Sequence, residues 1–385
     1  MIQKADRLNN VKEYYFSSKL REVSNLVKQG NPVINMAIGS PDLQPPANVI
    51  DAIKKAMELH NAHQYQSYQG TPEFRDGIRE FYKNNYNVNL NSDEEILPLM
   101  GSKEGIMHIS MAFLNEGDRV LIPNPGYPTY ASVTKLVGAE PVFYNLSESN
   151  SWLPDFKDIE KKDLTKVKIM WVNYPHMPTG AKASKEDFEQ LISFAKKHNI
   201  LIVNDNPYSF ILNNNPLSIL SVEGAKDVAI ELNSLSKTFN MAGWRVGMAV
   251  GAQEFIKTIL QVKSNMDSGM FLGIQKGAIE AFKLSKEWFM DQNLIYKKRR
   301  DLVWEIFNKL DCSFDKSKSG LFVWAKLPKG RNSEEFIDEL LYKKNIFIAP
   351  GTVFGTNGEG YIRASLCVNE EVLLEVLNRL TAVKI

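Results

Sequence analysis

Short apolar runs alternate with amphipathic segments along most of this 385-residue chain. Clear examples of the apolar runs are residues 166–173, 200–204, 228–232 and 246–250. Runs of about 4–8 residues bounded by polar turns predict buried strands, whereas apolar positions three and four residues apart predict helices. Because the two patterns alternate, we expect an α/β fold whose mostly parallel sheet is covered by helices on both faces.

The pattern changes toward both ends of the chain. Residues 12–29 have apolar positions at helical spacing, and a short strand is predicted over 33–38. From about residue 283, a long helix precedes strands predicted at 321–325, 346–349 and 361–365 and a final helix from Glu370. This C-terminal pattern predicts a separate α+β domain.

Composition limits the kinds of partner that we expect the protein to bind. The chain has 46 lysines and arginines against 45 aspartates and glutamates, so its net charge of +1 creates no field for nucleic acid or an acidic membrane. No run of eighteen apolar residues occurs, and the first ten residues lack an apolar signal core. Cys312 and Cys367 cannot form a disulfide framework. We expect a cytoplasmic protein that binds small molecules.

The segment 233–251, NSLSKTFNMAGWRVGMAVG, contains the residues with the most specific chemistry. Lys237 is predicted on a turn between two buried strands, close to Arg245. Burial and a neighbouring cation both lower the pKa of an ammonium group, which favours the free amine that reacts with carbonyls. Ser234, Ser236 and the Arg245 guanidinium suit a phosphate. An isolated turn of this kind is more often an exposed loop, so other segments must support the interpretation.

Several polar residues follow predicted strands elsewhere. Gly101, Ser102 and Lys103 join a strand to a helix, where free backbone N–H groups form an anion site. Tyr127 and Asp205 lie at the carboxyl ends of strands, the edge where open α/β sheets bind ligands. Tyr208 follows Asp205 by three residues, so a carboxylate and a phenol could contact opposite sides of one flat ring. Each feature alone is weak evidence for a site, because packing or a plain turn explains it as well or better.

Together these segments resemble the class I/II aminotransferases of the fold-type I pyridoxal phosphate (PLP) superfamily, in family order and over nearly the whole chain. The resemblance implies a seven-stranded, mostly parallel sheet in a large PLP-binding domain, residues 41–282. Residues 1–40 and 283–385 would form the small domain. PLP would be the cofactor, and the protein would be a homodimer with composite active sites.

The resemblance also implies a role for each site residue. Lys237 would hold PLP and move the substrate proton, Asp205 would pair with the pyridine nitrogen, and Tyr208 would donate to the ring oxygen. Tyr127 would stack on the ring, while Gly39 and Arg363 would bind the substrate α-carboxylate. The phosphate would be held by Gly101, Ser102, Lys103, Ser234, Ser236 and Arg245, with Tyr65 reaching into the second subunit's site.

Two segments need separate interpretation. The turn Y-P-H-M-P-T-G has Met177 where the family usually has an asparagine that donates to the ring oxygen, and the role of His176 stays open. The segment 265–271, NMDSGMF, offers Asp267 either to a substrate amine or, as we favour, to a helix cap. No metal site is predicted.

The function implied is transfer of an amino group from an L-amino acid to a 2-oxo acid, commonly 2-oxoglutarate, by a ping-pong mechanism. Some motifs, G-S-K-E-G and N-M-D-S-G, are similar to the diaminopimelate aminotransferase-related branch. A PLP-dependent β-lyase acting on cysteine conjugates would use the same residues. A non-catalytic protein that binds an effector on this fold is the more distant alternative.

Overall fold

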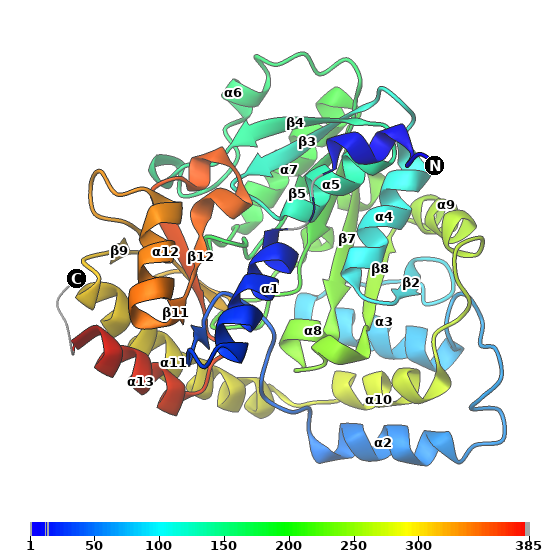
Figure 1. Ribbon diagram of the computed structural model, residues 1–385. Helices are drawn as coiled ribbons and strands as arrows, with labels where there is room; N and C mark the ends of the chain where they lie inside the picture. Colours follow the sequence, from blue (N-terminus) through cyan, green and yellow to red (C-terminus); the bar gives the residue numbers. More distant parts are fainter. Residues whose placement is uncertain (1, 12, 14, 382–385) are drawn as a thin grey trace.

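The computed structural model describes residues 2–11, 13 and 15–381, and a seven-stranded sheet lies at its centre (Figure 1). The strand order is β2-β8-β7-β6-β5-β3-β4. The strands are β2 (Ile96–Leu99), β3 (Arg119–Asn124), β4 (Glu140–Asn145), β5 (Val167–Val172), β6 (Leu201–Asp205), β7 (Ala229–Ser234) and β8 (Gly247–Gly251). Only β8 is antiparallel to its neighbours, β2 and β7. The predicted mostly parallel sheet is confirmed.

Helices cover both faces of this sheet because alternate strand residues point to opposite faces. In β5, Ile169 and Trp171 pack with α4 (Ser102–Phe113), α5 (Pro128–Leu136) and α9 (Gln253–Lys263). Met170 and Val172 belong to the core on the other face, which includes α7 (Lys185–His198). All four strand residues are fully buried. The continuous apolar runs in the sequence therefore reflect strands buried on two sides.

Further helices extend the large domain. They are α2 (Ala47–Met57), α3 (Pro72–Tyr86), the short α6 (Phe156–Ile159) and α10 (Leu272–Phe282), and α10 packs against both α2 and α3. The start of helix α3 is set by its first residues. The Thr71 hydroxyl accepts a hydrogen bond from the Phe74 N–H at 3.3 Å, and Pro72 occupies the first turn, where no N–H partner is needed.

The C-terminal part forms a smaller α+β unit from α11 (Lys286–Lys309), α12 (Ser333–Lys344) and α13 (Glu370–Thr381) around a four-stranded sheet. That sheet has the order β12-β13-β10-β9, with β9 (Ser313–Phe314), β10 (Phe322–Lys326), β12 (Ala349–Pro350) and β13 (Tyr361–Ser365). The single strand predicted over 346–349 is wrong. The chain leaves β11 (Ile346–Phe347) and enters a different sheet at β12, so hydrogen-bond partners change within four residues.

The N-terminal segment joins this smaller unit. Strand β1 (Ile34–Asn35) pairs in parallel with β11, and it follows α1 (Tyr15–Lys28), which Figure 1 shows beside the small domain. The pairing agrees with assigning the first forty residues to the small domain, although the boundaries at 40 and 282 stay predictions. The predicted helix over 12–29 includes Lys12 and Tyr14, which lie outside the described residues. In the described part of the chain, no helix has the length and apolar character needed to cross a membrane.

The parallel strands bring distant sequence segments to one edge of the central sheet. Strand β6 ends at Asp205, and β7 ends at Ser234, directly before the one-turn helix α8 (Leu235–Thr238) that contains Lys237. The N-terminus of α4 follows β2 near the same edge, because β2 and β7 both pair with β8. Residues more than one hundred positions apart therefore meet around a single cleft.

Candidate active site

The cleft has a volume of about 410 Å³ and lies between the sheet edge and the small domain. It is lined by most of the residues that the sequence singled out: Gly39, Ser102, Lys103, Tyr127, Asp205, Tyr208, Ser234, Ser236, Lys237, Arg245 and Arg363. Of the predicted site residues, Gly101 and Tyr65 do not line it. Sequence reasoning missed its apolar lining, formed mainly by Phe16, Leu20, Ile38, Phe322 and Phe354.

Lys237 is placed by the start of α8. The Ser234 hydroxyl accepts a hydrogen bond from the Ser236 N–H at 3.1 Å and so caps this short helix. The Lys237 Nζ reaches across the cleft and donates to the carbonyl of Gly39. Burial lowers the pKa of Lys237, and Arg363 and Arg245 lower it further, against an opposing effect of Cys367. The sequence had suggested Arg245 alone as the neighbouring cation.

Asp205 is 5% exposed and has one oxygen without a partner among the described residues. Its Oδ2 accepts a hydrogen bond from the Tyr130 hydroxyl at 2.9 Å, whereas its buried Oδ1 accepts none. Burial raises the pKa of Asp205 to about 7, partly offset by the Tyr130 hydrogen bond. A buried carboxylate oxygen with spare capacity at a cleft fits a protonated ring nitrogen, which would restore its charged form.

Tyr130, which donates the hydrogen bond to Asp205, was not identified from the sequence. Its ring stacks on Trp171 at a centroid distance of 4.9 Å, and this packing fixes its hydroxyl against the carboxylate. Tyr127, one turn earlier, begins α5 and lies edge-on to Tyr130. The i, i+3 spacing of the two tyrosines in the sequence was the available signal, because residues so spaced lie on one helix face.

The N-terminus of α4 has the features of a phosphate cradle. Gly101 precedes it with a φ of +89° and no side-chain cap, so the first N–H groups of the helix remain available to an anion. The positive φ favours glycine at this position, and a Cβ there would lie 2.3 Å from the Arg245 Nη2, so the guanidinium would have to shift. Burial and Arg245 lower the pKa of Lys103. Two cations and a helix N-terminus at one end of the cleft fit a dianionic phosphate.

Arg363 lies at the opposite, apolar end. It is 4% exposed, its Nη2 donates to the Ala37 carbonyl at 2.6 Å, and its guanidinium lies over the Phe322 ring at 3.9 Å. The Phe354 ring is 4.5 Å away. Contacts with two aromatic rings and the Ala37 carbonyl restrict the orientation of the guanidinium, which suits two parallel hydrogen bonds to a carboxylate. Gly39 is close by, because a Cβ there would lie 2.2 Å from the Phe322 ring.

Met177 and His176 point in different directions. Met177 lines the cleft, and its sulfur lies 3.3 Å from the Arg363 Nη1. His176 is buried beside Thr179, with 2.8 Å between its Nδ1 and the threonine hydroxyl, and burial lowers its pKa to about 3. It is not among the lining residues. His176 is therefore a neutral packing residue and does not take the place of the asparagine that Met177 replaces.

Tyr65 and Asp267 lie outside the cleft. Tyr65 is 91% exposed, so a role in a second subunit's site stays a prediction. The preferred assignment of Asp267 to a helix cap is wrong, because α10 begins after Phe271. Its Oδ1 instead lies 2.5 Å from the Nζ of Lys263, one turn earlier in the chain. The ion pair with a buried lysine holds the aspartate away from the helix start.

The sheet topology and the cleft are those of fold-type I PLP-dependent enzymes. Residues 31–380 match the family described as aminotransferase class I and II. LL-diaminopimelate aminotransferase of Halothermothrix orenii is 42% identical over 98% of both chains. The substrate-bound BacF structure from Bacillus subtilis has a TM-score of 0.95 at 34% identity, covering 99% of this chain and 98% of that one. An aminotransferase structure from Staphylococcus aureus has a TM-score of 0.90 at 35% identity, covering 98% of both chains. This chain belongs to the class I and II aminotransferases and is PLP-dependent.

The raised pKa of Asp205 predicts a pH effect on the protein stripped of PLP. Its ordinary value is 3.8 and its folded value about 7, so the folded chain keeps a proton that the unfolded chain has released. The resulting stabilisation is fully present below pH 3.8 and is lost as the pH rises through 7.

Between about pH 4.5 and about pH 6.5, the unfolding free energy of the wild type should therefore fall relative to Asp205→Asn by up to about 1.4 kcal/mol per pH unit. Chemical denaturation of both cofactor-free proteins measures this difference. Asparagine keeps an acceptor for Tyr130 but does not titrate, so a difference independent of pH would show that Asp205 is ionised throughout.

Proposed function

We propose that this aminotransferase uses L-amino acids with apolar side chains as donors and a 2-oxo acid, 2-oxoglutarate first, as acceptor. The observation that carries the proposal is the position of Arg363 within an apolar end of the cleft. Among the described residues, those that are charged and line the cleft are Lys103, Asp205, Lys237, Arg245 and Arg363. Four of them are accounted for by the cofactor, which leaves Arg363 for the α-carboxylate and none for the donor side chain.

The surroundings of Arg363 support an apolar donor side chain. Phe16 and Leu20 of α1 line the cleft with Phe322 and Phe354, and Met177 covers one edge of the guanidinium. A substrate carboxylate on Arg363 therefore has aromatic and aliphatic neighbours. Apolar groups gain free energy when they leave water for such a wall, whereas a charged group would lose its hydration without a partner.

The proposed roles of the catalytic residues follow from their positions. When bound, PLP supplies a ring that accepts electron density from the substrate Cα. Asp205 Oδ1 would accept a hydrogen bond from the protonated ring nitrogen, and Tyr208 would present its phenol to the ring oxygen from the wall of the cleft. Burial lowers the pKa of Lys237, which favours the free amine, and its Nζ would accept the substrate Cα proton. Arg363 orients the substrate, and the surrounding aromatic rings exclude water.

LL-diaminopimelate is a second candidate donor. It is favoured by relatives that carry the name LL-diaminopimelate aminotransferase at 40% and 42% identity over nearly the whole chain. That donor has a second amino and a second carboxylate group, so its distal end would need polar partners beyond the five charged residues of the cleft. These polar partners would have to come from a second subunit.

A panel of donors tests the substrate proposal. With 2-oxoglutarate as acceptor, leucine, methionine and phenylalanine should exceed alanine by about tenfold or more in kcat/KM, because one buried methylene is worth about 1–3 kcal/mol in an apolar pocket. LL-diaminopimelate, aspartate and lysine complete the panel. Preference for LL-diaminopimelate would overturn the apolar assignment. Pyruvate and thiol formed from a cysteine conjugate without an amino acceptor would indicate a β-lyase.

The matched control for this panel is Arg363→Lys. The charge remains but the two-pronged geometry is lost. Every amino-acid donor should then lose kcat/KM by a similar factor, because all share the α-carboxylate, while the order of side-chain preference stays unchanged. A loss confined to one donor would place Arg363 beside the side chain instead.

Two further properties belong to the proposal. A homodimer is supported by the family to which the chain belongs and by the exposed Tyr65, which stands outside its own cleft with 91% of its surface accessible. A cytoplasmic location is supported by the two free cysteines, Cys312 and Cys367.

Complementation tests the composite site. A Tyr65→Phe chain mixed with a Lys237→Ala chain should form heterodimers with one site that carries both lesions and one that carries neither. Activity should therefore reappear on mixing, up to about one quarter of the wild-type value at equal mixing, since half of the dimers are hybrids with one intact site of two. Tagged purification of the hybrid verifies its formation. A hybrid without recovery would place Tyr65 in its own subunit's site or in neither.

A further inference from the structure

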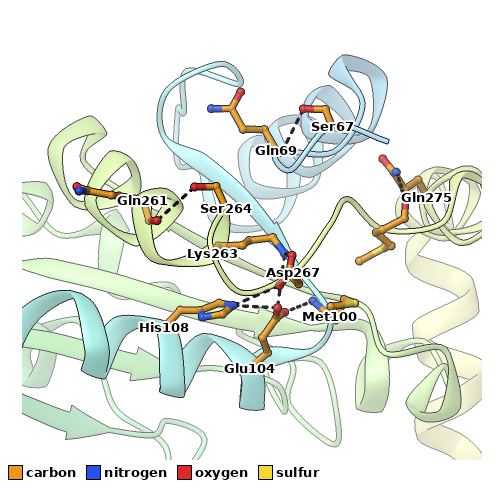
Figure 2. Close-up of polar contacts among 11 residues, drawn as sticks. Ser67, Gln69, Met100, Glu104, His108, Gln261, Lys263, Ser264, Asp267 and Gln275 are labelled. Atoms are coloured by element: carbon orange, nitrogen blue, oxygen red, sulfur yellow. Dashed lines mark hydrogen bonds and ion pairs between the residues drawn. The ribbon is translucent and has the colours of Figure 1, made fainter. Parts of the chain in front are cut away.

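A buried ionic cluster lies behind the phosphate cradle, and Figure 2 shows its side chains converging between α4 and α9. Its members are Glu104, His108, Lys263 and Asp267. The Glu104 Oε1 lies 2.9 Å from the His108 Nε2 and 3.5 Å from the Lys263 Nζ. Lys263 and His108 are 2% and 3% exposed. Charged side chains are rarely buried to this degree, and neither contact with the cleft nor packing on the sheet accounts for their burial here.

The cluster has its own cation. The ligand atoms of Glu104, His108 and Asp267 lie within 4.8 Å of one another, a spacing that would suit a metal ion. The Lys263 ammonium lies 2.5 Å from Asp267 Oδ1, however, and supplies the positive charge at that place. Burial opposes ionisation of Glu104, but the hydrogen bond with His108, the charge of Lys263 and the Met100 N–H lower its pKa below the ordinary value. Glu104 is therefore an ionised acceptor whose charge is offset.

Glu104 uses its second oxygen on the cradle itself. Its Oε2 accepts a hydrogen bond from the backbone N–H of Met100, the residue just before Gly101. Glu104 is the third residue of α4, and a glutamate at this position can reach back to a free N–H before the helix. Gly101 has a φ of +89°, so the turn is held by few backbone constraints of its own. The Glu104 contact fixes the direction in which the turn enters the helix.

The same cluster joins the cradle to another segment of the chain. Asp267 belongs to the loop 265–271, whose Gly269 packs so closely on the Gln66 and Ser67 carbonyls that a Cβ would lie 2.2 and 2.3 Å from them. Buried Gln275 strengthens this junction, because it accepts from the Thr71 N–H at 2.7 Å and donates to the Met270 carbonyl at 2.6 Å. The loop is thus fixed on one side by residues 66–71 and on the other by Lys263.

We propose that Glu104 is a positioning residue for the cofactor phosphate, acting through its hydrogen bond to the Met100 N–H. The Lys263 ammonium, held by Asp267, offsets the charge of the Glu104 carboxylate, because an uncompensated anion at the start of α4 would repel the phosphate. The inference rests on the proposed placement of the phosphate at Gly101 and Ser102. It adds a role for a residue that does not touch the cleft.

Binding of two cofactor analogues to the cofactor-free protein tests this role. Pyridoxine 5′-phosphate and pyridoxine differ only in the phosphate, and neither has the aldehyde needed to react with Lys237. In Glu104→Ala, affinity for the phosphate ester should fall by about tenfold or more, the scale of one hydrogen bond to a charged group, with pyridoxine binding nearly unchanged. In Glu104→Gln, which retains an acceptor for Met100, the loss should stay within about threefold.

Glu254→Ala is the matched control, because Glu254 lies exposed in the first turn of α9 and should leave both affinities unchanged. A Glu104→Ala protein that binds the phosphate ester as the wild type does would overturn the proposal, as would equal losses for both analogues. If Glu104→Ala does not fold, Lys263→Met should still weaken the phosphate ester selectively by leaving the carboxylates without a cation, and unchanged selectivity there would also overturn it. Failure of the wild type to prefer the phosphate ester would contradict the placement of the cofactor itself.

Discussion

The candidate active site depends on two ionisable groups that the edge of the central sheet removes from bulk water. Asp205 at the end of β6 is buried and Lys237 just after β7 is half-buried. Burial raises the pKa of Asp205 and lowers the pKa of Lys237, so it favours the neutral form of each group. Asp205 would not be retained there for stability alone, because its buried Oδ1 has no hydrogen-bond partner among the described residues and such a group costs free energy. That oxygen instead matches a protonated ring nitrogen, and an amine whose charged form burial disfavours matches a carbonyl.

The two ends of the cleft differ in their charge and in the chemical group that each can bind. At one end, Lys103, Arg245 and the N-terminus of α4 concentrate positive potential where a phosphate fits. At the other end, the Arg363 guanidinium contacts the Phe322 and Phe354 rings, so each of the two units of the chain supplies one end of the cleft. The proposed reaction occurs where these ends meet, at Lys237.

The sequence predicted the strands and the cleft residues well because both leave local patterns. Buried parallel strands are continuous apolar runs, and the residues at their carboxyl ends meet whatever their separation in the chain. Contacts between distant side chains leave no such pattern. Four features depend on packing that only the structure shows. They are the hydrogen bond from Tyr130 to Asp205, the contact of the Met177 sulfur with Arg363, the ion pair that holds Asp267 away from α10, and the change of sheet near Ile348.

The central claim is that Lys237 holds the cofactor, and chemical trapping tests it most directly. Borohydride reduction of the PLP-loaded protein fixes the cofactor to the amine that carries it, and peptide mass mapping then identifies the residue. The label should fall on the peptide containing Lys237 and be absent from Lys237→Ala, which should still bind PLP through Ser102, Ser234, Arg245 and Asp205. A stoichiometric label on another lysine, Lys103 included, would contradict the account.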